Sequence, residues 1–489
     1  MRVSDWSSEK FWKLLEFPKD ASDRLKVLLR KFSLREDFFL VGGAIRDTLC
    51  DVPFKDLDFT LKEDLEKFFS FAGKFLGFSQ VILSEEFGIY RLAKEKMSID
   101  FTKMRGENIE EDLGLRDFTF NAIAIRVKNL IEGRGDFVDP FGGIKDLKEG
   151  IIRGISQEVF YDDPLRVLRG YRFFSAGFGR IEEKTRKYFK ECRELLRFCA
   201  AERINYELTR ILVSSRAYES FKLMDEDGVL EVLFPFVKDC KGVEQPSFHH
   251  LDVWGHLLES LRWAEEIVNN PKTYLEPVKE FIDFDVFKDE DFRVIVKLSA
   301  FFHDAGKAYT YELRDRITFY GHEKVSKEIF EEVAEKLRFK GKIVERVSLL
   351  VKNHMRPFHL LNEKEKGSLS LRAKRNLIRD VPYLLELLVV CLADSYASQG
   401  PDKDPDYEVK VLEFFKELFS LKEELSKQQK REKRIITGHD LIALGLKPGP
   451  IFKEILQEVE LLFLEKKITS KEQALDFVKN KYCKNLKLS

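Results

Sequence analysis

Residues 39–60, FLVGGAIRDTLCDVPFKDLDFT, decide how the first part of this chain folds. The apolar run at residues 38–41 predicts a short strand that ends in Gly42 and Gly43, and residues 44–47 (AIRD) then begin a helix. Glycine at such a turn lets the backbone approach a phosphate with no Cβ in the way, and the helix N-terminus offers free N–H groups to the anion. The stretch predicts a strand–turn–helix unit that binds phosphate.

Two carboxylates follow on the next predicted strand, residues 57–61. Asp56 and Asp58 lie on the same face of that strand, about 7 Å apart at Cα, because side chains alternate. Mg²⁺ prefers oxygen ligands and keeps waters and substrate phosphates. Asp100, in MSIDFT, is a candidate third carboxylate for a two-metal centre that activates a 3′-hydroxyl and stabilises the leaving pyrophosphate. The alternatives are a solvated strand face for the pair and an ordinary edge-strand Asp at residue 100.

The rest of the chain divides by its apolar periodicity. Four predicted strands (38–41, 57–61, 98–102 and 122–127) are separated by helical stretches, which makes the first 150 residues a small α/β unit. From about residue 151 the spacing is helical, as at 165–174, 185–198 and 203–214. The fold class is therefore α+β. We expect a helical extension (1–36), a head (37–150), a helical neck (151–240), a histidine-bearing helical unit (246–400) and a helical tail (405–489).

Composition narrows the class of protein. The 489 residues are 35% charged, yet the formal net charge is −1, so a polyanion must be held by local basic patches rather than by a global field. None of the six cysteines forms a CxxC pair, no signal peptide is apparent, and no apolar run is long enough to span a membrane. We expect a cytoplasmic protein with reduced thiols and no membrane partner.

Several motifs in a fixed order point to a known family. VGGAIRDTL and DLDFT are followed by EEDLGLRDFTFNAIAI (110–125), DPFGGIKDLKEGIIR (139–153), DDPLRVLRGYRF (162–173) and ERINYELTRIL (202–212). Together they resemble the class II tRNA nucleotidyltransferases and bacterial poly(A) polymerases, within the polymerase-β superfamily. The resemblance covers about the first 240 residues. It implies a polymerase-β-like head with a mixed sheet and helices, followed by all-α neck, metal-binding and tail domains.

The resemblance also assigns roles to residues of the head. It places catalytic Mg²⁺ on Asp56 and Asp58. The triphosphate would be handled by four residues, Gly42, Gly43, Arg46 and Asp47. Arg116 and Asp117 match the motif that recognises the ribose, although Leu115 stands where relatives usually carry another Arg.

In this family an Asp and an Arg read the incoming base in place of a nucleic-acid template. Asp163 and Arg166 match them, and at (i, i+3) on a helix they share a face. The carboxylate only accepts hydrogen bonds and the guanidinium only donates them, which fits CTP or ATP and rejects UTP and GTP. Arg169 and Arg172 lie near that face and are candidates for phosphate contacts. The alternatives are an ordinary helix ion pair and ordinary surface arginines.

A second constellation lies in the histidine-bearing region. His303 and Asp304 occur in SAFFHDAGK on an otherwise apolar helix, where a metal would compensate the charge. With His256 and Asp394 the pair resembles the metal site of the HD phosphohydrolase superfamily. Two more histidines, His322 and His354, match positions that permit a second metal. The resemblance implies a divalent transition metal with phosphatase or cyclic phosphodiesterase activity; structural histidines are the alternative.

The segment between Arg105 and Arg116 bears on which nucleotides are added. It holds only ten residues, GENIEEDLGL, whereas the resemblance ties a longer loop there to the switch from C to A addition. We therefore expect CC addition from CTP to the 3′ end of tRNA, which is held by shape and phosphate contacts. A separate A-adding enzyme would complete the end. The alternatives are full CCA addition that also uses ATP, poly(A) synthesis, a nucleotidyltransferase-HD signalling enzyme and a non-catalytic RNA-binding protein.

Overall fold

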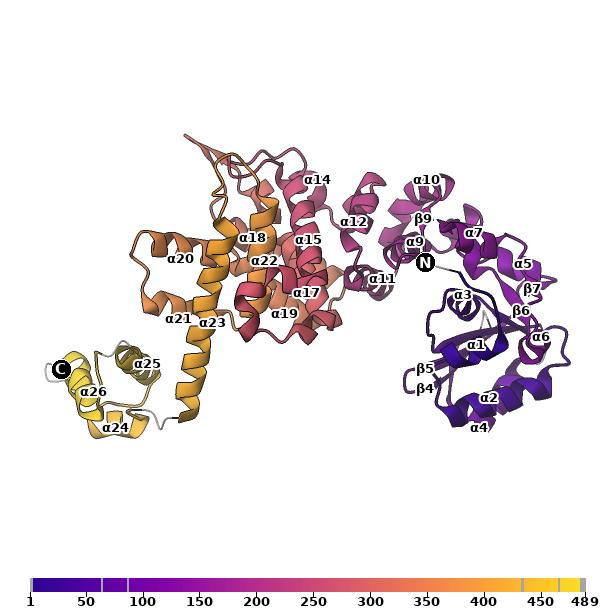
Figure 1. Ribbon diagram of the computed structural model, residues 1–489, viewed down its shortest axis with the longest axis horizontal. Coiled ribbons are helices and arrows are strands. Elements are labelled where there is room, and N and C mark those ends of the chain that lie inside the picture. The colour runs from indigo at the N-terminus through magenta and orange to yellow at the C-terminus, as the bar shows by residue number, and fades with distance from the viewer. Residues whose placement is uncertain (1–2, 63–64, 86–87, 432–434, 465–466, 484–489) are drawn as a thin grey trace. The chain divides into compact units, whose positions relative to one another are not determined.

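The computed structural model describes residues 3–62, 65–85, 88–431, 435–464 and 467–483 (Figure 1). The chain forms two compact units. The first unit is Met1–Lys238 with Glu335–Arg338, and the second unit is Asp239–Ala334 with Phe339–Ser489. The first boundary falls close to the predicted gap between neck and histidine-bearing unit. The finer division into five parts stays a prediction.

A mixed sheet of seven strands forms the centre of the head, in the order β3-β4-β5-β2-β1-β6-β7. β2 and β5 pair in parallel, and the other neighbours pair antiparallel. The strands are β1 Phe39–Val41, β2 Asp56–Leu61, β3 Ser79–Ser84, β4 Ile89–Lys94, β5 Met97–Lys103, β6 Ala124–Arg126 and β7 Phe137–Val138. The expected mixed sheet with helices is confirmed.

Alternation along β2 separates the core from the candidate site. Leu57 and Phe59 are buried, and Phe59 stacks on Phe101 of β5 with ring centroids 5.5 Å apart. The ring of Phe68, from α4 (Leu65–Leu76), lies 5.1 Å from that of Phe101, so α4 covers this face. α2 (Lys19–Phe32) lies beside α4 (Figure 1). The odd-numbered residues of β2 are therefore committed to the core, and Asp56 and Asp58 face away from it.

The sequence pattern does not predict the hairpin of β3 and β4, because it indicates helical stretches between its four strands. β3 is an edge strand whose Val81, Ile82 and Leu83 are all exposed, so it lacks the apolar–polar alternation that marks a half-buried strand. The four predicted strands are present, with ends shifted by one or two residues. The edge position of β3, where neither face is covered, explains why β3 is missed, whereas β4 buries Tyr90 and Leu92 on one face.

Helices make up most of the remainder of the first unit, apart from the parallel pair β8 (Ile151–Ile152) and β9 (Arg180–Ile181). They are α1 Ser8–Leu14, α3 Gly43–Leu49, α5 Ile109–Gly114, η1 Thr119–Asn121, α6 Val127–Glu132, α7 Gly143–Glu149, α8 Glu158–Asp162, α9 Leu165–Ser175, α10 Glu183–Cys192, η2 Arg193–Phe198, α11 Ala201–Val213, α12 Ala217–Glu226, α13 Val229–Leu233 and α14 Phe236–Cys240, whose last two residues belong to the second unit. α9 packs against α11 and α12, which confirms the helical neck.

The second unit is also helical, with one short hairpin of β10 (Glu312–Leu313) and β11 (Ile317–Thr318) among its described residues. α15, α17 and α22 pack together at its centre. Its helices are α15 Val253–Asn269, α16 Pro271–Tyr274, η3 Glu276–Phe281, η4 Phe284–Lys288, α17 Glu290–Phe302, η5 Ala305–Tyr309, α18 His322–Lys336, α19 Gly341–Asn353, α20 Met355–Glu365, α21 Leu371–Asp380 and α22 Leu384–Ala397. No helix in the described ranges is long and apolar enough to cross a membrane.

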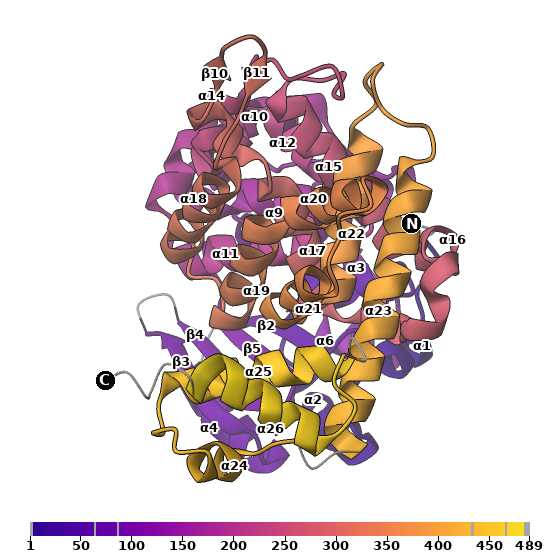
Figure 2. The ribbon, with the colours of Figure 1, turned by 90° about the vertical axis from the view of Figure 1, so that its left-hand side faces the viewer.

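The C-terminal helices are α23 Tyr407–Arg431, α24 Gly438–Ala443, α25 Pro450–Leu464, α26 Lys471–Val478 and η6 Lys479–Cys483. α23, which the sequence placed in the tail, packs along α22 and η3. α24, α25 and α26 are grouped together (Figure 2) and share a small core of their own that includes Leu441, Ile455 and Val478. The expected helical character of this segment is confirmed.

Candidate active site and metal centre

The turn after β1 strongly favours glycine. Gly42 has φ +73°, and a Cβ on it would lie 2.9 Å from Nη1 of Arg116 and 3.8 Å from Oδ2 of Asp58. The Nε of Arg116 is buried without a hydrogen-bond partner. An open cradle thus lies between a carboxylate and an incompletely satisfied guanidinium, at the start of α3. Such a cradle suits a cation together with a phosphate.

The three predicted carboxylates lie on adjacent parallel strands. Asp58 is paired in register with Asp100, whose carboxylate accepts two hydrogen bonds of 2.7 Å from Arg91. Asp56 Oδ1 accepts a 2.7 Å bond from the hydroxyl of Ser98. Burial raises the pKa of Asp58 to about 6; Arg116 opposes the rise, and the carboxylates of Asp100 and Asp56 add to it. A divalent cation would remove the cost of the charge, so the donor set fits Mg²⁺.

A chain of polar contacts joins the helix after the glycine turn to the predicted ribose motif. Arg46 forms a bidentate pair with Asp47 at 2.8 and 2.9 Å and donates a 2.6 Å bond to Oδ1 of Asn121. Asn121 donates in turn to Asp117 at 2.8 Å, and Arg169 donates to the same carboxylate at 2.7 Å. Burial raises the pKa of Asp117, but Arg169 and Asn121 outweigh it and lower the value to about 2. Asp117 is therefore a fixed anion.

Asp163 and Arg166 do not share one helix, which corrects the sequence interpretation. Asp163 has extended backbone at the end of α8, and Arg166 lies in the first turn of α9, which begins after Pro164. Asp163 Oδ2 accepts a 2.8 Å bond from Arg203, and Arg166 donates a 3.1 Å bond to the carbonyl of Val159. Pro164 ends α8, because proline restricts the residue before it to extended backbone.

One cavity of about 860 Å³ nevertheless brings the predicted residues together. It is lined by Gly42, Gly43, Arg46, Asp47, Asp56, Asp58, Arg116, Asp117, Asp163, Arg166, Arg169 and Arg172. Asp100 is the one predicted head residue outside the lining. Arg172 is paired with Glu207 at 2.6 Å, so it and Arg169 already have anionic partners.

In the second unit, the histidine rings are oriented as metal ligands. Nδ1 of His303, His322 and His354 donates to the carbonyls of residues 300, 319 and 351 at 2.7–2.8 Å, which leaves each Nε2 with a lone pair. His303 Nε2 lies 3.2 Å from His256 Nε2, and His322 Nε2 lies 3.4 Å from His354 Nε2. The Nε2 lone pairs of His322 and His354 therefore face each other in a buried site, and they repel unless a cation lies between them.

The carboxylates complete two groups with metal-ligand geometry among the described residues. His256, His303, Asp304 and Asp394 form the first, and Asp304, His322 and His354 form the second. Asp304 belongs to both. Its Oδ2 lies 3.2 Å from His303 Nε2, and its Oδ1 lies 3.1 Å from His322 Nε2. The predicted six-residue set is brought together.

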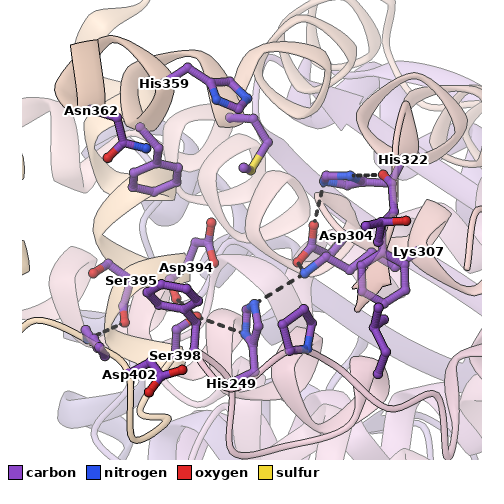
Figure 3. Close-up of a pocket in the computed structure, with 18 of the residues that line it drawn as sticks. His249, Asp304, Lys307, His322, His359, Asn362, Asp394, Ser395, Ser398 and Asp402 are labelled. Carbon is purple, nitrogen blue, oxygen red and sulfur yellow. Dashed lines mark hydrogen bonds and ion pairs between the residues drawn. The ribbon is translucent and has the colours of Figure 1, made fainter. Parts of the chain in front are cut away.

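A cavity of about 680 Å³ opens beside these groups (Figure 3). Asp304 and Asp394 reach it from one side, and His359 and Asn362 from α20 lie across from them. Lys307 forms an ion pair with Asp304 at 2.5 Å. Nδ1 of His249 donates to the hydroxyl oxygen of Ser398 at 3.1 Å, because the Ser398 hydroxyl donates to the carbonyl of Asp394. Burial followed by the charge of Lys307 lowers the pKa of His249 to about 2. The His249 side chain is therefore neutral where it lines the cavity.

Comparison with known proteins agrees with this geometry. The poly A polymerase head domain matches residues 38–153, a probable RNA and SrmB-binding site of polymerase A matches 179–241, and the HD domain matches 253–399. An A-adding tRNA nucleotidyltransferase of Deinococcus radiodurans is 30% identical over 86% of this chain and 89% of its own length. The chain belongs to the tRNA nucleotidyltransferase family. A CC-adding member from Thermus thermophilus is also 30% identical, over 91% of this chain and 94% of its own length.

Solved structures of the family share the fold. The Thermotoga maritima CCA-adding enzyme complexed with tRNA aligns with a TM-score of 0.63 at 24% identity, over 98% of this chain and 99% of the other. The family thus includes relatives named for A addition and for CC addition at equal identity to this chain.

Two residues that line the cavity and contact the predicted site residues carry no signal of their own in the sequence. Arg203 pairs with Asp163, and Asn121 joins Arg46 to Asp117. Both lie in motifs quoted above, but neither residue type indicates a site by itself, because an exposed helix Arg and a buried Asn are common. The sequence pattern likewise assigns no role to His249. Only the tertiary contacts identify these three.

Proposed function

We propose that this chain adds two cytidines from CTP to the 3′ end of tRNA without a nucleic-acid template. Family membership supports template-independent nucleotide addition to tRNA, and the choice of CC rests on one further observation. β5 ends at Lys103 and α5 begins at Ile109, so only five residues connect the third-carboxylate strand to the helix before Arg116. Asn108 caps α5 by accepting from the backbone of Glu111 at 2.9 Å.

The short connection bears on specificity because the family ties A addition to a longer loop at this point. Residues 104–108 are anchored at both ends: the Met104 N–H donates to the carbonyl of Leu61, and the Arg105 N–H donates to Asp112. A segment held in this way cannot reshape the base site for ATP. A separate enzyme would then have to add the terminal adenosine.

In the proposed reaction each part of the cavity has one task. Gly42, Gly43 and the start of α3 receive the triphosphate, and Arg116 is placed to bind a phosphate oxygen beside Asp58. Mg²⁺, held by Asp56 and Asp58, would activate the RNA 3′-hydroxyl and stabilise the leaving pyrophosphate. Asp163 accepts from the exocyclic amine of cytosine, and Arg166 donates to its ring nitrogen and carbonyl. Asp100 supports Asp58 from the neighbouring strand.

The experiment supplies tRNA ending at the discriminator base with CTP and ATP together and then sequences the 3′ ends. We expect products that end in CC even when ATP is in excess. The larger base of ATP needs a change in the shape of the base site, and the short connection does not allow that change. Products ending mostly in CCA would overturn the CC assignment and leave the family assignment in place. Addition of A runs without prior CC would favour the poly(A) polymerase alternative.

We propose a second activity for the second unit, the hydrolysis of phosphate esters at a divalent transition-metal centre. The observation that supports it is the pair of facing Nε2 lone pairs of His322 and His354, which fits a bound cation next to a cavity of about 680 Å³. Metal ions bound there would generate a nucleophile from water. The chain's own contribution is to bridge both groups through Asp304 and to place Lys307 beside them. Phosphate release from model esters by the metal-loaded protein tests this activity.

A further inference from the structure

The guanidinium of Arg46 rests against two aromatic rings. Its central carbon, Cζ, lies 5.0 Å from the ring centroid of Phe173 and 5.0 Å from that of Phe178. The two centroids are themselves 5.3 Å apart, with the ring planes at 82°. Because the three distances are nearly equal, the guanidinium sits in the notch between the rings and is not sandwiched by them. We call Phe173 and Phe178 the aromatic notch.

The aromatic notch and Arg46 come from different elements of the first unit. Arg46 lies in the first turn of α3, directly after the glycine turn, whereas Phe173 lies on α9 and Phe178 in the connection from α9 to β9. All three side chains line the nucleotide cavity. The two phenylalanines are 1% and 7% exposed, so the contact is nearly free of water, where a cation gains most from a ring face. The notch thus joins the turn that receives the triphosphate in the proposed reaction to the helix that carries Arg166.

Hydrogen bonds fix the edge of the same guanidinium. Nε and Nη2 of Arg46 donate to the carboxylate of Asp47 at 2.8 and 2.9 Å, and Nη1 donates to Asn121 at 2.6 Å. These bonds use one N–H on each terminal nitrogen, which carries two. A Cβ on Gly43 would lie 3.6 Å from Nη2, so this nitrogen stands beside the glycine turn. Its second N–H is therefore available to a phosphate oxygen bound at the turn.

Aliphatic side chains could fill the notch, but they would not attract the guanidinium. The ring of Phe173 also lies 4.4 Å from Cζ of Arg172 and 5.8 Å from Cζ of Arg169, so three cavity arginines gather around one ring. Like charges at this spacing repel, and the electron-rich ring faces offset part of that repulsion. The aromatic character of the notch therefore helps to keep Arg46 in place while the cavity is empty of phosphate.

We propose that Phe173 and Phe178 are positioning residues that hold the Arg46 guanidinium where it meets the triphosphate of the incoming nucleotide. The proposal rests on the nucleotide addition proposed above and explains how the cavity is organised before the nucleotide arrives. Neither ring touches the reacting atoms. Loss of the notch should weaken the binding of CTP and leave the KM for tRNA unchanged.

The test uses Phe178, because Arg46 is the one cation that the described contacts place over its ring. Phe178→Leu should raise the Kd for CTP in Mg²⁺ by about 2- to 30-fold, the equivalent of one cation–π contact of about 0.5–2 kcal/mol. Phe178→Tyr keeps the ring and should bind CTP as the wild type does. Phe178→Met is a second variant without a ring, so a poorly folded Phe178→Leu still leaves a decisive measurement.

Phe120 offers a matched control for lost packing. Its ring is fully buried and stacks on that of Phe178 at 5.7 Å, but the described contacts place no cation over it. Phe120→Leu should therefore lower the melting temperature and leave the Kd for CTP unchanged. A Kd that rises equally in Phe120→Leu and Phe178→Leu would mean that packing alone is at work and would overturn the proposal.

A double-mutant cycle tests whether the ring acts through Arg46. Arg46→Gln removes the charge, so adding Phe178→Leu to it should raise the Kd for CTP no further. Full additivity of the two changes would overturn the proposal, as would an unchanged Kd in Phe178→Leu. The Kd is measured without tRNA, so the cycle stays decisive if the wild type makes CCA ends, a result that overturns the CC assignment alone. A wild-type protein that binds no CTP would overturn both proposals.

Discussion

At the scale of single residues, the geometry of Gly42 gives a prediction for both stability and CTP binding. Gly42→Ala should lower stability by at least about 1–2 kcal/mol, because its positive φ disfavours a Cβ. It should also raise the KM for CTP, because the Cβ would displace Arg116. Gly142 shares a positive φ of +72°, but a Cβ on it would meet no atom within 4 Å, so Gly142→Ala should cost stability and leave the KM unchanged. The measurements are the KM for CTP and the thermal unfolding of both variants. An equal KM for CTP in both would contradict the role of the Gly42 turn in binding the triphosphate.

Base choice is a second prediction at this scale. Asp163→Ala and Arg166→Ala should relax discrimination against UTP and GTP by about 1–3 kcal/mol per lost base contact, by analogy with side-chain readout of bases in DNA. Arg203→Ala should relax it less, because Arg203 only holds the carboxylate of Asp163. The measurement is kcat/KM for each of the four nucleotides. Continued exclusion of UTP and GTP in both single variants would count against a protein template.

The residues that the sequence predicted are those whose type is unusual in its setting. Asp56 and Asp58 repel each other on one strand face unless a cation lies between them, and His303 and Asp304 are costly to bury on an apolar helix, so their presence indicates a site. Arg203 carries no such signal, since an exposed arginine on a helix costs nothing. Its role follows only from the bond to Asp163, which joins residues 40 positions apart.

At the scale of elements, the sequence predicted four central strands and missed the hairpin of β3, which has no covered face, and β4, which buries Tyr90 and Leu92 on one face. The same limit applies to Asp163 and Arg166. Their spacing suggested one helix, but Pro164 separates α8 from α9 and the pair meets at a helix junction. The cavity still receives both side chains, because α9 packs against α11 and both helices line it. Spacing thus identified the residues, and packing decided how they are presented.

Helix packing in the second unit predicts its metal content. α15, the end of α17 and α22 supply the first ligand group, and α18 and the end of α19 supply the histidines of the second. We expect two divalent ions per chain. His354→Ala should reduce the content to about one, because only the second group loses a ligand, and Asp304→Asn should lower both occupancies, consistent with the strong dependence of metal sites on each ligand. The measurement is metal content by mass spectrometry after dialysis, with His359→Ala as the control. Equal content in all variants would contradict the ligand assignment.

At the scale of the whole molecule, the two centres draw their ligands from different units. Every predicted residue of the nucleotide cavity lies in the first unit, and all six HD ligands lie in the second. Asp58→Ala should lower the rate of nucleotide addition by about a hundredfold or more, because the variant lacks a proposed Mg²⁺ ligand. It should not lower the melting temperature, because burial of the Asp58 carboxylate without metal is itself unfavourable.

The separation predicts that each centre can be disabled alone. Asp304→Asn should lose transition metal and phosphate-ester hydrolysis yet add nucleotides within about twofold of the wild-type rate, since the two centres share no residue. Asp58→Ala should show the reverse pattern, with full HD metal content. Both variants are assayed for primer extension in Mg²⁺, for ester hydrolysis and for thermal unfolding. A loss of nucleotide addition in Asp304→Asn at an unchanged melting temperature would contradict this independence. It would mean that the second unit takes part in nucleotide addition, for example by contacting the RNA primer.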